Sequence, residues 1–278
     1  MSTPRHVLVA GASSGIGAAT VDALLARGHA VTASVRDPAD AAVLERRHDG
    51  ARLQVVRFDV TDTEGMAEVV RDVAAAGPLH AVVANAGIAV AAPLAHLPVD
   101  DLRRVLEVNV VGQVALVQAA LPALRRDGGR VVVVGSLAGR LAGPMLGAYA
   151  ASKAALATAT QVLRAELAPR GVPVVLVEPG VTASPIWHRA LAATADLRDR
   201  LGPDVQRDYG ALWDQLAAEG ARNAEGGAPP QRVAQVIVRE VEAPRPRARR
   251  LVGRDAHLAA ALATLPGRVR DRLLAARH

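Results

Sequence analysis

Short valine-rich runs alternate with longer alanine- and arginine-rich stretches along almost the whole chain, and this alternation limits the folds that it can adopt. The apolar runs cover 6–10, 30–35, 52–58, 79–84, 130–135, 172–177 and 250–252. They are continuously apolar, which is typical of strands that are covered on both faces. Helical candidates lie between them, at 15–28, 38–48, 62–76, 99–127, 149–168 and 230–242.

Strand and helix candidates therefore repeat as β-α units. This pattern predicts an α/β fold that is doubly wound and Rossmann-type, with a mostly parallel seven-stranded sheet and helices on both faces. Nothing resembling a linker divides the chain, so a single domain over 1–278 is expected, with a substrate loop or lid inserted at about 180–229. This insertion is expected to be the least regular part of the chain because of the prolines in it and at its end: Pro185, Pro203, Pro229 and Pro230. Trp187, Tyr209 and Trp213 lie in that insertion. They either contact the substrate or anchor a small helical flap.

Composition excludes several classes of protein. No uninterrupted apolar run reaches about 18 residues, so the sequence predicts no transmembrane helix and no membrane partner. The chain has no cysteine, which excludes disulfides and thiolate metal sites and fits a cytoplasmic location. The 8 histidines show no paired spacing, so no metal site is expected. The net charge is +6, but the basic residues are dispersed and aromatics make up 2%, so no nucleic-acid partner is expected.

A glycine-rich loop follows the first predicted strand and opens the first predicted helix. Its candidate binding residues are Gly11, Ser13, Ser14, Gly15, Ile16 and Gly17. Glycines let the backbone approach a ligand closely, and a helix N-terminus offers free N–H groups and a positive dipole end to a pyrophosphate. The spacing is G-x-x-x-G-x-G rather than the common G-x-G-x-x-G, but the loop has the strand before it and the helix after it that a dinucleotide site needs.

The end of the second predicted strand distinguishes NADP from NAD. An acidic residue at this place bonds the ribose 2′-hydroxyl of NAD, whereas an arginine accommodates the 2′-phosphate of NADP. Val35 takes the usual acidic place and Arg36 follows it, which favours NADP(H). Asp37, the next residue, keeps NAD as the alternative.

Tyr149 and Lys153 form the most specific pair in the chain. Of 33 basic side chains, Lys153 is the only lysine, and it stands one helical turn after one of the 2 tyrosines. A spacing of four places both side chains on one helix face. An ammonium beside a phenol can promote proton transfer, and the fixed fork of arginine does not reproduce that point charge. Ser136, which follows the fifth predicted strand, adds a hydroxyl that can donate to a carbonyl oxygen. The alternative for the pair is an accident of an arginine-rich composition.

Together these motifs resemble those of the short-chain dehydrogenase/reductase family in its single-domain form, over roughly residues 5–182. The matching segments are the loop from Gly11 to Gly17, Asp59-Val60, Asn85-Ala86-Gly87, Asn109, Ser136, Tyr149 with Lys153, and Pro179-Gly180. The chain departs from the family pattern at Ala10 and Ala84, where threonine and a second asparagine are common. Both departures concern the bracing of loops.

The resemblance implies roles for the residues at the ends of the strands. Asp59 would bind the adenine amino group, and Val60 would pack on the ring. Asn85, Ala86 and Gly87 would lie along the cofactor ribose. A further segment would brace the nicotinamide and phosphates: Pro179, Gly180, Val181 and Thr182. For Asp59 and Asn85 the alternative is an ordinary turn at a strand end.

The resemblance also implies the catalytic set. Tyr149 would be the general acid/base, and Lys153 would lower its pKa and bind the nicotinamide ribose. Ser136 would polarise the carbonyl. Asn109 would distort its helix and hold a water in the proton relay; alternatively, it is an interior polar residue bonded to backbone.

The expected function is an NADP(H)-preferring oxidoreductase that interconverts a ketone or aldehyde and an alcohol on a hydrophobic small molecule. A non-catalytic dinucleotide-binding redox sensor is the alternative, and a sugar-nucleotide epimerase or dehydratase is a more distant one. The resemblance further implies a homodimer or homotetramer that is formed through the helices at 99–127 and 149–168.

Overall fold

A parallel sheet forms the centre of the computed structural model, which describes residues 3–48, 50 and 52–275. Its strands are β1 (His6–Val9), β2 (Ala30–Val35), β3 (Leu53–Arg57), β4 (Ala81–Ala84), β5 (Arg130–Val134), β6 (Val174–Pro179) and β7 (Arg249–Val252). They form a 7-stranded sheet in the order β3-β2-β1-β4-β5-β6-β7, with every neighbouring pair parallel. The strand order reverses between β1 and β4, and ligands bind at such a point in open α/β sheets. The predicted fold class is confirmed.

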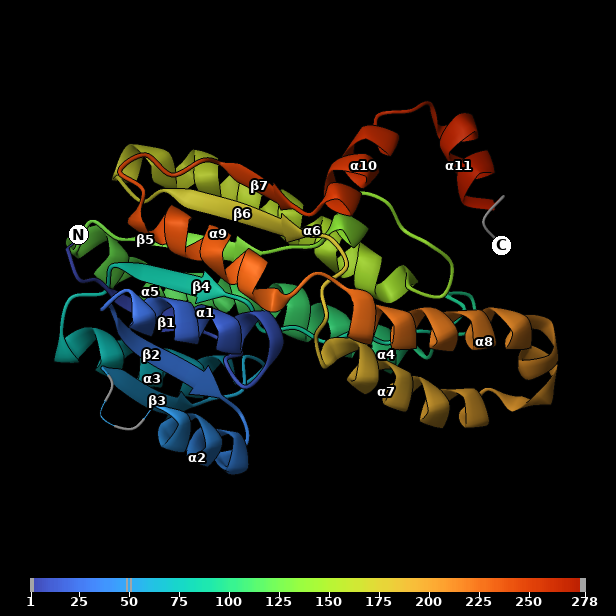
Figure 1. The fold of residues 1–278 in the computed structure, drawn as a ribbon, viewed down its shortest axis with the longest axis horizontal. Helices are drawn as coiled ribbons and strands as arrows, with labels where there is room; N and C mark the ends of the chain where they lie inside the picture. The colour runs from blue at the N-terminus through green and yellow to red at the C-terminus, as the bar shows by residue number, and fades with distance from the viewer. Residues whose placement is uncertain (1–2, 49, 51, 276–278) are drawn as a thin grey trace.

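Helices cover both faces of this sheet, as Figure 1 shows. One layer contains α1 (Gly15–Ala26), α2 (Pro38–Arg47) and α9 (Pro230–Glu242). The other contains α3 (Thr63–Ala76), α5 (Gly112–Arg126) and α6 (Gly147–Leu167). Each layer encloses its own apolar core: Leu24 and Ile237 lie in one core, and Leu116 and Leu156 lie in the other. The strands are therefore apolar on both sides, which explains their unbroken valine runs.

The helix predicted over 99–127 is not regular. It consists of α4 (Val99–Leu106), a π-helical turn at Glu107–Val111, and α5. By length and composition alone the helix Val99–Arg126 could cross a membrane, because its most apolar window has a mean hydropathy of 1.4. A search for uninterrupted apolar runs does not detect this helix, because polar residues such as Asn109 and Gln113 interrupt it. Leu116 packs in the core, yet only 39% of the window is buried, so part of its apolar surface remains uncovered.

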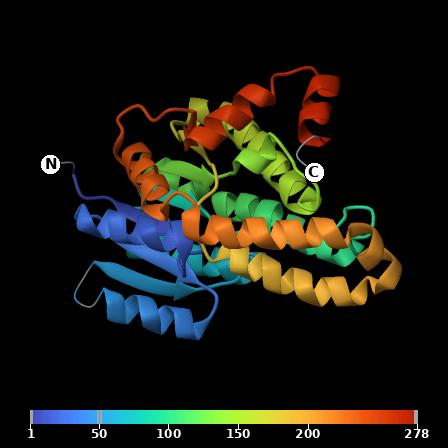
Figure 2. The ribbon, with the colours of Figure 1, turned by 45° about the vertical axis from the view of Figure 1, so that its right-hand side comes forward.

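The insertion expected at 180–229 is a helical hairpin, although the sequence indicated the least regular part of the chain. It contains α7 (Ile186–Arg200) and α8 (Gly202–Gly226). Figures 1 and 2 both show the hairpin projecting beyond the carboxyl ends of the strands. The backbone N–H of Ala183 donates to Ala228 (3.0 Å), and that of Ala228 donates to Val181 (3.0 Å). These bonds close the base of the hairpin at the end of β6.

Two further helices, which the sequence did not predict, follow β7. They are α10 (Arg254–Leu262) and α11 (Gly267–Ala275), and they stand apart from the sheet in Figure 1. The carboxylate of Asp255, in the first turn of α10, accepts a hydrogen bond from the backbone N–H of Val181. The first turn of α10 thus supports the loop that follows β6.

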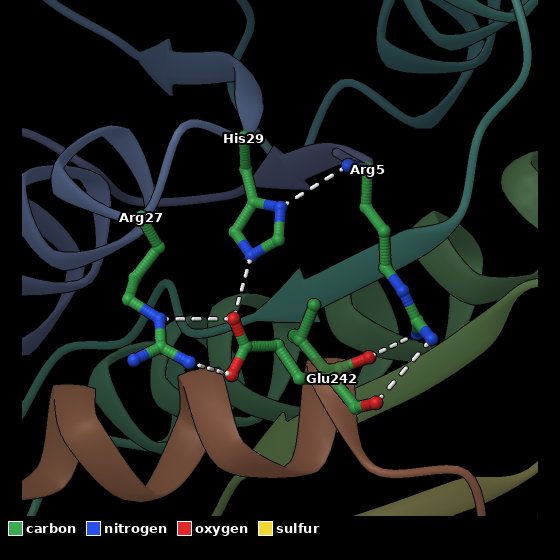
Figure 3. A network of polar contacts seen from close by, with 5 residues as sticks. Arg5, Arg27, His29 and Glu242 are labelled. Carbon is green, nitrogen blue, oxygen red and sulfur yellow. Dashed lines mark hydrogen bonds and ion pairs between the residues drawn. The ribbon is translucent and has the colours of Figure 1, made fainter. Parts of the chain in front are cut away.

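A polar network ties the start of the chain to the end of α9 (Figure 3). The buried His29 accepts a hydrogen bond at Nδ1 from the backbone N–H of Arg5 (3.1 Å), and its Nε2 lies 3.1 Å from Glu242. Because Nδ1 accepts, the ring carries its proton on Nε2 and donates it to the carboxylate. Arg27 donates to both oxygens of Glu242 (3.0 and 2.6 Å), while Arg5 donates to the carbonyl of Val241. The network lies at the amino ends of the strands.

Candidate active site

A cavity of about 1010 Å³ opens at the carboxyl ends of the strands, beneath the α7–α8 hairpin. The site residues predicted from the sequence line it with three exceptions. Gly17 and Pro179 lie behind the cavity wall, and Asn109 is fully buried beside it. The sheet thus brings together motifs that are far apart in the sequence, as expected for the carboxyl edge of a doubly wound fold.

The glycine-rich loop is tightly packed. Gly11 and Gly15 have φ of +68° and +56°, a region that favours glycine. A Cβ on Gly11 would lie 2.7 Å from Cα of Ala86, and a Cβ on Gly17 would lie 2.1 Å from the carbonyl oxygen of Gly11. Gly17 is therefore required for packing of helix on loop rather than for contact with a ligand. The hydroxyl of Ser14 makes no capping bond, so the N–H groups of the first turn of α1 are available to an anion.

Asn85 braces this loop from β4. Its side-chain nitrogen donates to the carbonyl oxygens of Ala10 (3.2 Å) and Gly11 (2.9 Å). Asn85 also lines the cavity together with Ala86 and Gly87. The Asn85 amide therefore fixes the distance between the ends of β1 and β4. It does more than an ordinary turn residue, which was the alternative in the sequence analysis.

Arg36 and Asp37 have different environments at the end of β2. Arg36 is 73% exposed, and its Nη1 lies 3.8 Å from Asp59 Oδ2. Asp37 caps α2 by accepting a hydrogen bond from the N–H of Ala39 (2.8 Å). Burial pushes the pKa of Asp59 upward, but hydrogen bonds from Thr61 and the charges of nearby arginines outweigh this, so the pKa lies below its usual value. A carboxylate and a largely exposed guanidinium thus lie together at this end of the cavity.

Tyr149, Lys153 and Ser136 meet at the other end. The Lys153 side chain is 4% exposed; its Nζ donates to the carbonyl of Val134 (3.0 Å) and lies 5.8 Å from the centre of the Tyr149 ring. Burial lowers the pKa of Lys153 to about 8. Burial also raises the pKa of the Tyr149 phenol, against a hydrogen bond with Ser136 that lowers it. Lys153 was expected to lower the pKa of Tyr149; in this structure desolvation of the phenol is the larger effect, and the pKa is raised instead.

Asn109 sits in the π-helical turn, where the distortion implied by the resemblance is present. Its Oδ1 accepts from the N–H of Ile88 (2.8 Å), and its Nδ2 donates to the carbonyl of Ile88 (2.9 Å) and to Ser152 Oγ (2.9 Å). Ser152 in turn donates to the carbonyl of Tyr149 (2.7 Å). Asn109 therefore clamps the loop after β4 to α6. Its part in a proton relay stays a prediction.

Apart from Trp187, several residues of the cavity wall were not identified from the sequence, because they belong to no motif. One apolar part of the wall contains Leu141, Ala142, Pro144, Met145, Leu146, Trp187, Leu212 and Leu216. Arg189 of α7 also lines the cavity, and its Nη2 donates to Ser14 Oγ (3.1 Å). Of the three aromatics noted in the insertion, Trp187 is on the wall, whereas Trp213 is buried with the Arg198 guanidinium 5.6 Å from its ring.

Comparison with known proteins gives consistent matches. The family model for short chain dehydrogenases matches residues 5–195. An NADPH-dependent 3-dehydrocapnine reductase of Ornithobacterium rhinotracheale is 34% identical, over 97% of this chain and 95% of that protein. A 3-amino-tetrahydro-pyrrolizinone reductase of Xenorhabdus hominickii is 35% identical, over 74% of this chain and 72% of that protein.

Solved structures of short-chain dehydrogenases have the same fold. A short chain dehydrogenase from Burkholderia cenocepacia J2315, in complex with NADP, superposes with a TM-score of 0.76 at 26% identity, covering 99% of each chain. A short-chain dehydrogenase from Streptomyces avermitilis gives a TM-score of 0.77 at 28% identity, over 98% of this chain and 95% of that one. With the motifs gathered on one cavity, these matches show that the chain belongs to the short-chain dehydrogenase/reductase family of oxidoreductases, as its sequence predicted.

Proposed function

We propose that this protein is an NADP(H)-dependent oxidoreductase that interconverts a carbonyl and an alcohol on a hydrophobic small molecule, with Tyr149 as general acid/base. The observation that carries the proposal is the meeting of Ser136, Tyr149 and Lys153 on the same cavity as the glycine-rich loop. Proton-transfer groups beside a dinucleotide cradle are what nicotinamide redox chemistry requires of a protein.

The cavity wall fits a dinucleotide phosphate. The uncapped start of α1 leaves N–H donors for a pyrophosphate, and Gly11 gives the loop before it a positive φ that favours glycine. Arg36 supports NADP(H) over NAD(H), because its guanidinium is 73% exposed and its ion pair with Asp59 is long (3.8 Å), so it can also pair with a 2′-phosphate. Asp37 does not decide the choice, because its Oδ1 caps α2 while its second oxygen can still accept from a ribose hydroxyl. NADP(H) is also supported by a relative named as NADPH-dependent and by a structural neighbour solved in complex with NADP.

The proton chemistry follows from the side chains. When bound, the reduced nicotinamide supplies a hydride to the carbonyl carbon. Tyr149 gives its phenolic proton to the carbonyl oxygen, and the Ser136 hydroxyl donates to the same oxygen. The neutral phenol is the form that reduction needs; it already predominates at neutral pH at the ordinary pKa of about 10, and burial raises the pKa of Tyr149 further.

Lys153 stabilises the tyrosinate that remains after proton transfer. With a pKa of about 8, its ammonium is mostly charged at neutral pH. That ammonium lies 5.8 Å from the centre of the Tyr149 ring, so its charge attracts the negative charge of a tyrosinate. Reprotonation of Tyr149 would pass through the polar groups around Asn109, which lie next to Lys153: a Cβ on Gly87 would lie 3.3 Å from Asn109 Oδ1 and 3.6 Å from Lys153 Nζ.

The substrate is proposed to be largely apolar. The wall between the residues after Ser136 and the α7–α8 hairpin is built from Leu141, Met145, Trp187 and Leu216, among others. Such a wall gains about 25 cal/mol for each Å² of apolar surface that it removes from water. The carbonyl would enter beside Tyr149, and the rest of the molecule would lie along this wall.

Replacement of Tyr149 tests the proposal. Tyr149→Phe removes the proton and keeps the ring, so kcat for reduction should fall by at least about 100-fold while the Kd for NADPH stays nearly constant. The measurements are NADPH oxidation against a panel of apolar ketones and aldehydes, and fluorescence titration of NADPH. Unchanged turnover in the variant would refute the role of Tyr149. NADPH binding by the wild type without turnover of any carbonyl would favour the redox sensor.

A further inference from the structure

Arg189 is the point at which α7 touches the glycine-rich loop. Its Nη2 donates to Ser14 Oγ (3.1 Å), directly before the first turn of α1. Both residues line the cavity. The contact therefore joins the projecting hairpin to the loop where a pyrophosphate would lie.

The segment that carries Arg189 is held in place by other contacts. A Cβ on Gly15 would lie 3.1 Å from Cβ of Ser184 and 3.8 Å from Cδ of Pro185. Trp187 donates from Nε1 to the carbonyl of Thr182 (3.1 Å). The beginning of α7 is thus packed against the glycine-rich loop, and the position of Arg189 follows from that packing.

The cations on the cavity wall divide by position. Within the described part of the chain they are Arg36, Arg104, Lys153 and Arg189. Arg36 and Arg104 act on Asp59, and Lys153 lies beside Tyr149. Arg189 alone among these four contacts the loop that cradles phosphate. A guanidinium forms short, charge-assisted hydrogen bonds to phosphate oxygens, in a fork geometry that suits a pyrophosphate.

We propose that Arg189 binds the pyrophosphate of the dinucleotide and so couples cofactor binding to the closed position of the α7–α8 hairpin. This rests on the proposed function, because the ligand is the dinucleotide. The hairpin also supplies Trp187 and Leu216 to the apolar wall. Because the same hairpin carries the pyrophosphate contact and part of the apolar wall, cofactor binding should stabilise that wall.

Cofactor affinity gives the first test. Arg189→Ala and Arg189→Gln should each raise the Kd for NADPH, measured by fluorescence titration, by about 10-fold, the usual effect of losing one charged hydrogen bond. Arg189→Lys should recover part of the loss. Because both dinucleotides contain a pyrophosphate, the Kd for NADH should rise by the same factor. Arg200→Ala is the matched control: it removes another α7 arginine, which bonds Asp101 on the protein surface, and should leave both Kd values unchanged.

Proteolysis gives a readout that does not depend on turnover. Saturating NADPH should slow tryptic cleavage within the hairpin in the wild type and in Arg200→Ala, and should protect much less in Arg189→Ala and Arg189→Gln. Unchanged Kd values and full protection in the Arg189 variants would overturn the inference. A loss confined to NADPH would also overturn it, because the contact would then be to the 2′-phosphate. Failure of the wild type to bind NADPH would instead refute the proposed function.

Discussion

Burial shifts the pKa values of Tyr149 and Lys153 in opposite directions, and both shifts favour the uncharged forms. The phenol holds its proton more tightly than usual, whereas the ammonium loses its proton near pH 8. The pair is therefore set for proton donation at neutral pH, with the lysine charged and the tyrosine neutral. The reverse reaction needs the tyrosinate, which is the less populated form.

The lysine sets an upper pH limit for reduction. Because its pKa is about 8, Lys153 is charged below that pH and becomes neutral above it, so the rate of carbonyl reduction should fall as the pH rises through 8. Lys153→Met should lower kcat by about 100-fold or more at neutral pH and remove this limb of the profile. The measurement is kcat against pH, with NADPH saturating.

Lys153→Arg is the informative control for that profile. A guanidinium keeps its charge throughout the accessible pH range but does not fit the geometry of the ammonium, so kcat should be reduced and should no longer fall above pH 8. A limb near pH 8 that persists in the arginine variant would show that another group causes it.

At the scale of single residues, the motifs could be predicted from the sequence, but the residues that they contact could not. Tyr149 and Lys153 were identifiable because one spacing on one helix fixes their geometry. The partners of Asn109, which are Ile88 and Ser152, could not be identified, because they depend on how a π-helical turn packs against α6. Arg189 was missed because no local pattern links α7 to a loop at the start of the chain.

Proline explains the main difference at the scale of elements. Pro185, Pro203, Pro229 and Pro230 indicated an irregular segment from the sequence. In the structure, Pro185 caps α7, Pro203 lies in the first turn of α8, and Pro229 and Pro230 begin α9. A proline is tolerated in a first turn, where its missing N–H is not needed. The same residues therefore separate helices here instead of preventing them.

The network in Figure 3 should contribute to stability and not to catalysis, because it lies at the amino ends of the strands. Glu242→Ala would leave the buried His29 without the carboxylate that accepts from its Nε2. An unsatisfied buried donor costs about 1–3 kcal/mol, so the free energy of unfolding in urea should fall by that amount while kcat stays unchanged.

Arg27→Ala separates the buried part of this network from its exposed part. The Arg27 side chain is 57% exposed, and surface ion pairs add little to stability, so this variant should lose much less than Glu242→Ala. Equal losses of unfolding free energy in the two variants would show that the exposed Arg27–Glu242 ion pair, and not the bond to His29, provides the stability. A fall in kcat for Glu242→Ala without loss of stability would contradict the structural role.

At the scale of the whole molecule, α6 and the helix Val99–Arg126 leave apolar surface uncovered. Val111 and Val162 are 46% and 49% exposed, and only 39% of the apolar window in Val99–Arg126 is buried. Ala151, Ala155 and Thr158 share the exposed face of α6 with Val162. Small residues in such a row let two helices approach closely, which suits packing against the same helices of a second copy.

We therefore expect a homodimer or homotetramer that is formed through these two helices. Val162→Asp places a charge on the face of α6, and burial of an unpaired charge is strongly unfavourable, so the variant should dissociate to monomers at concentrations at which the wild type stays associated. Size-exclusion chromatography with light scattering measures this directly. Leu258→Asp, on α10 at 56% exposure, carries the same type of change on an element outside this face and should leave the oligomer intact. A monomeric wild type, or equal dissociation of both variants, would show that these helices do not form the interface.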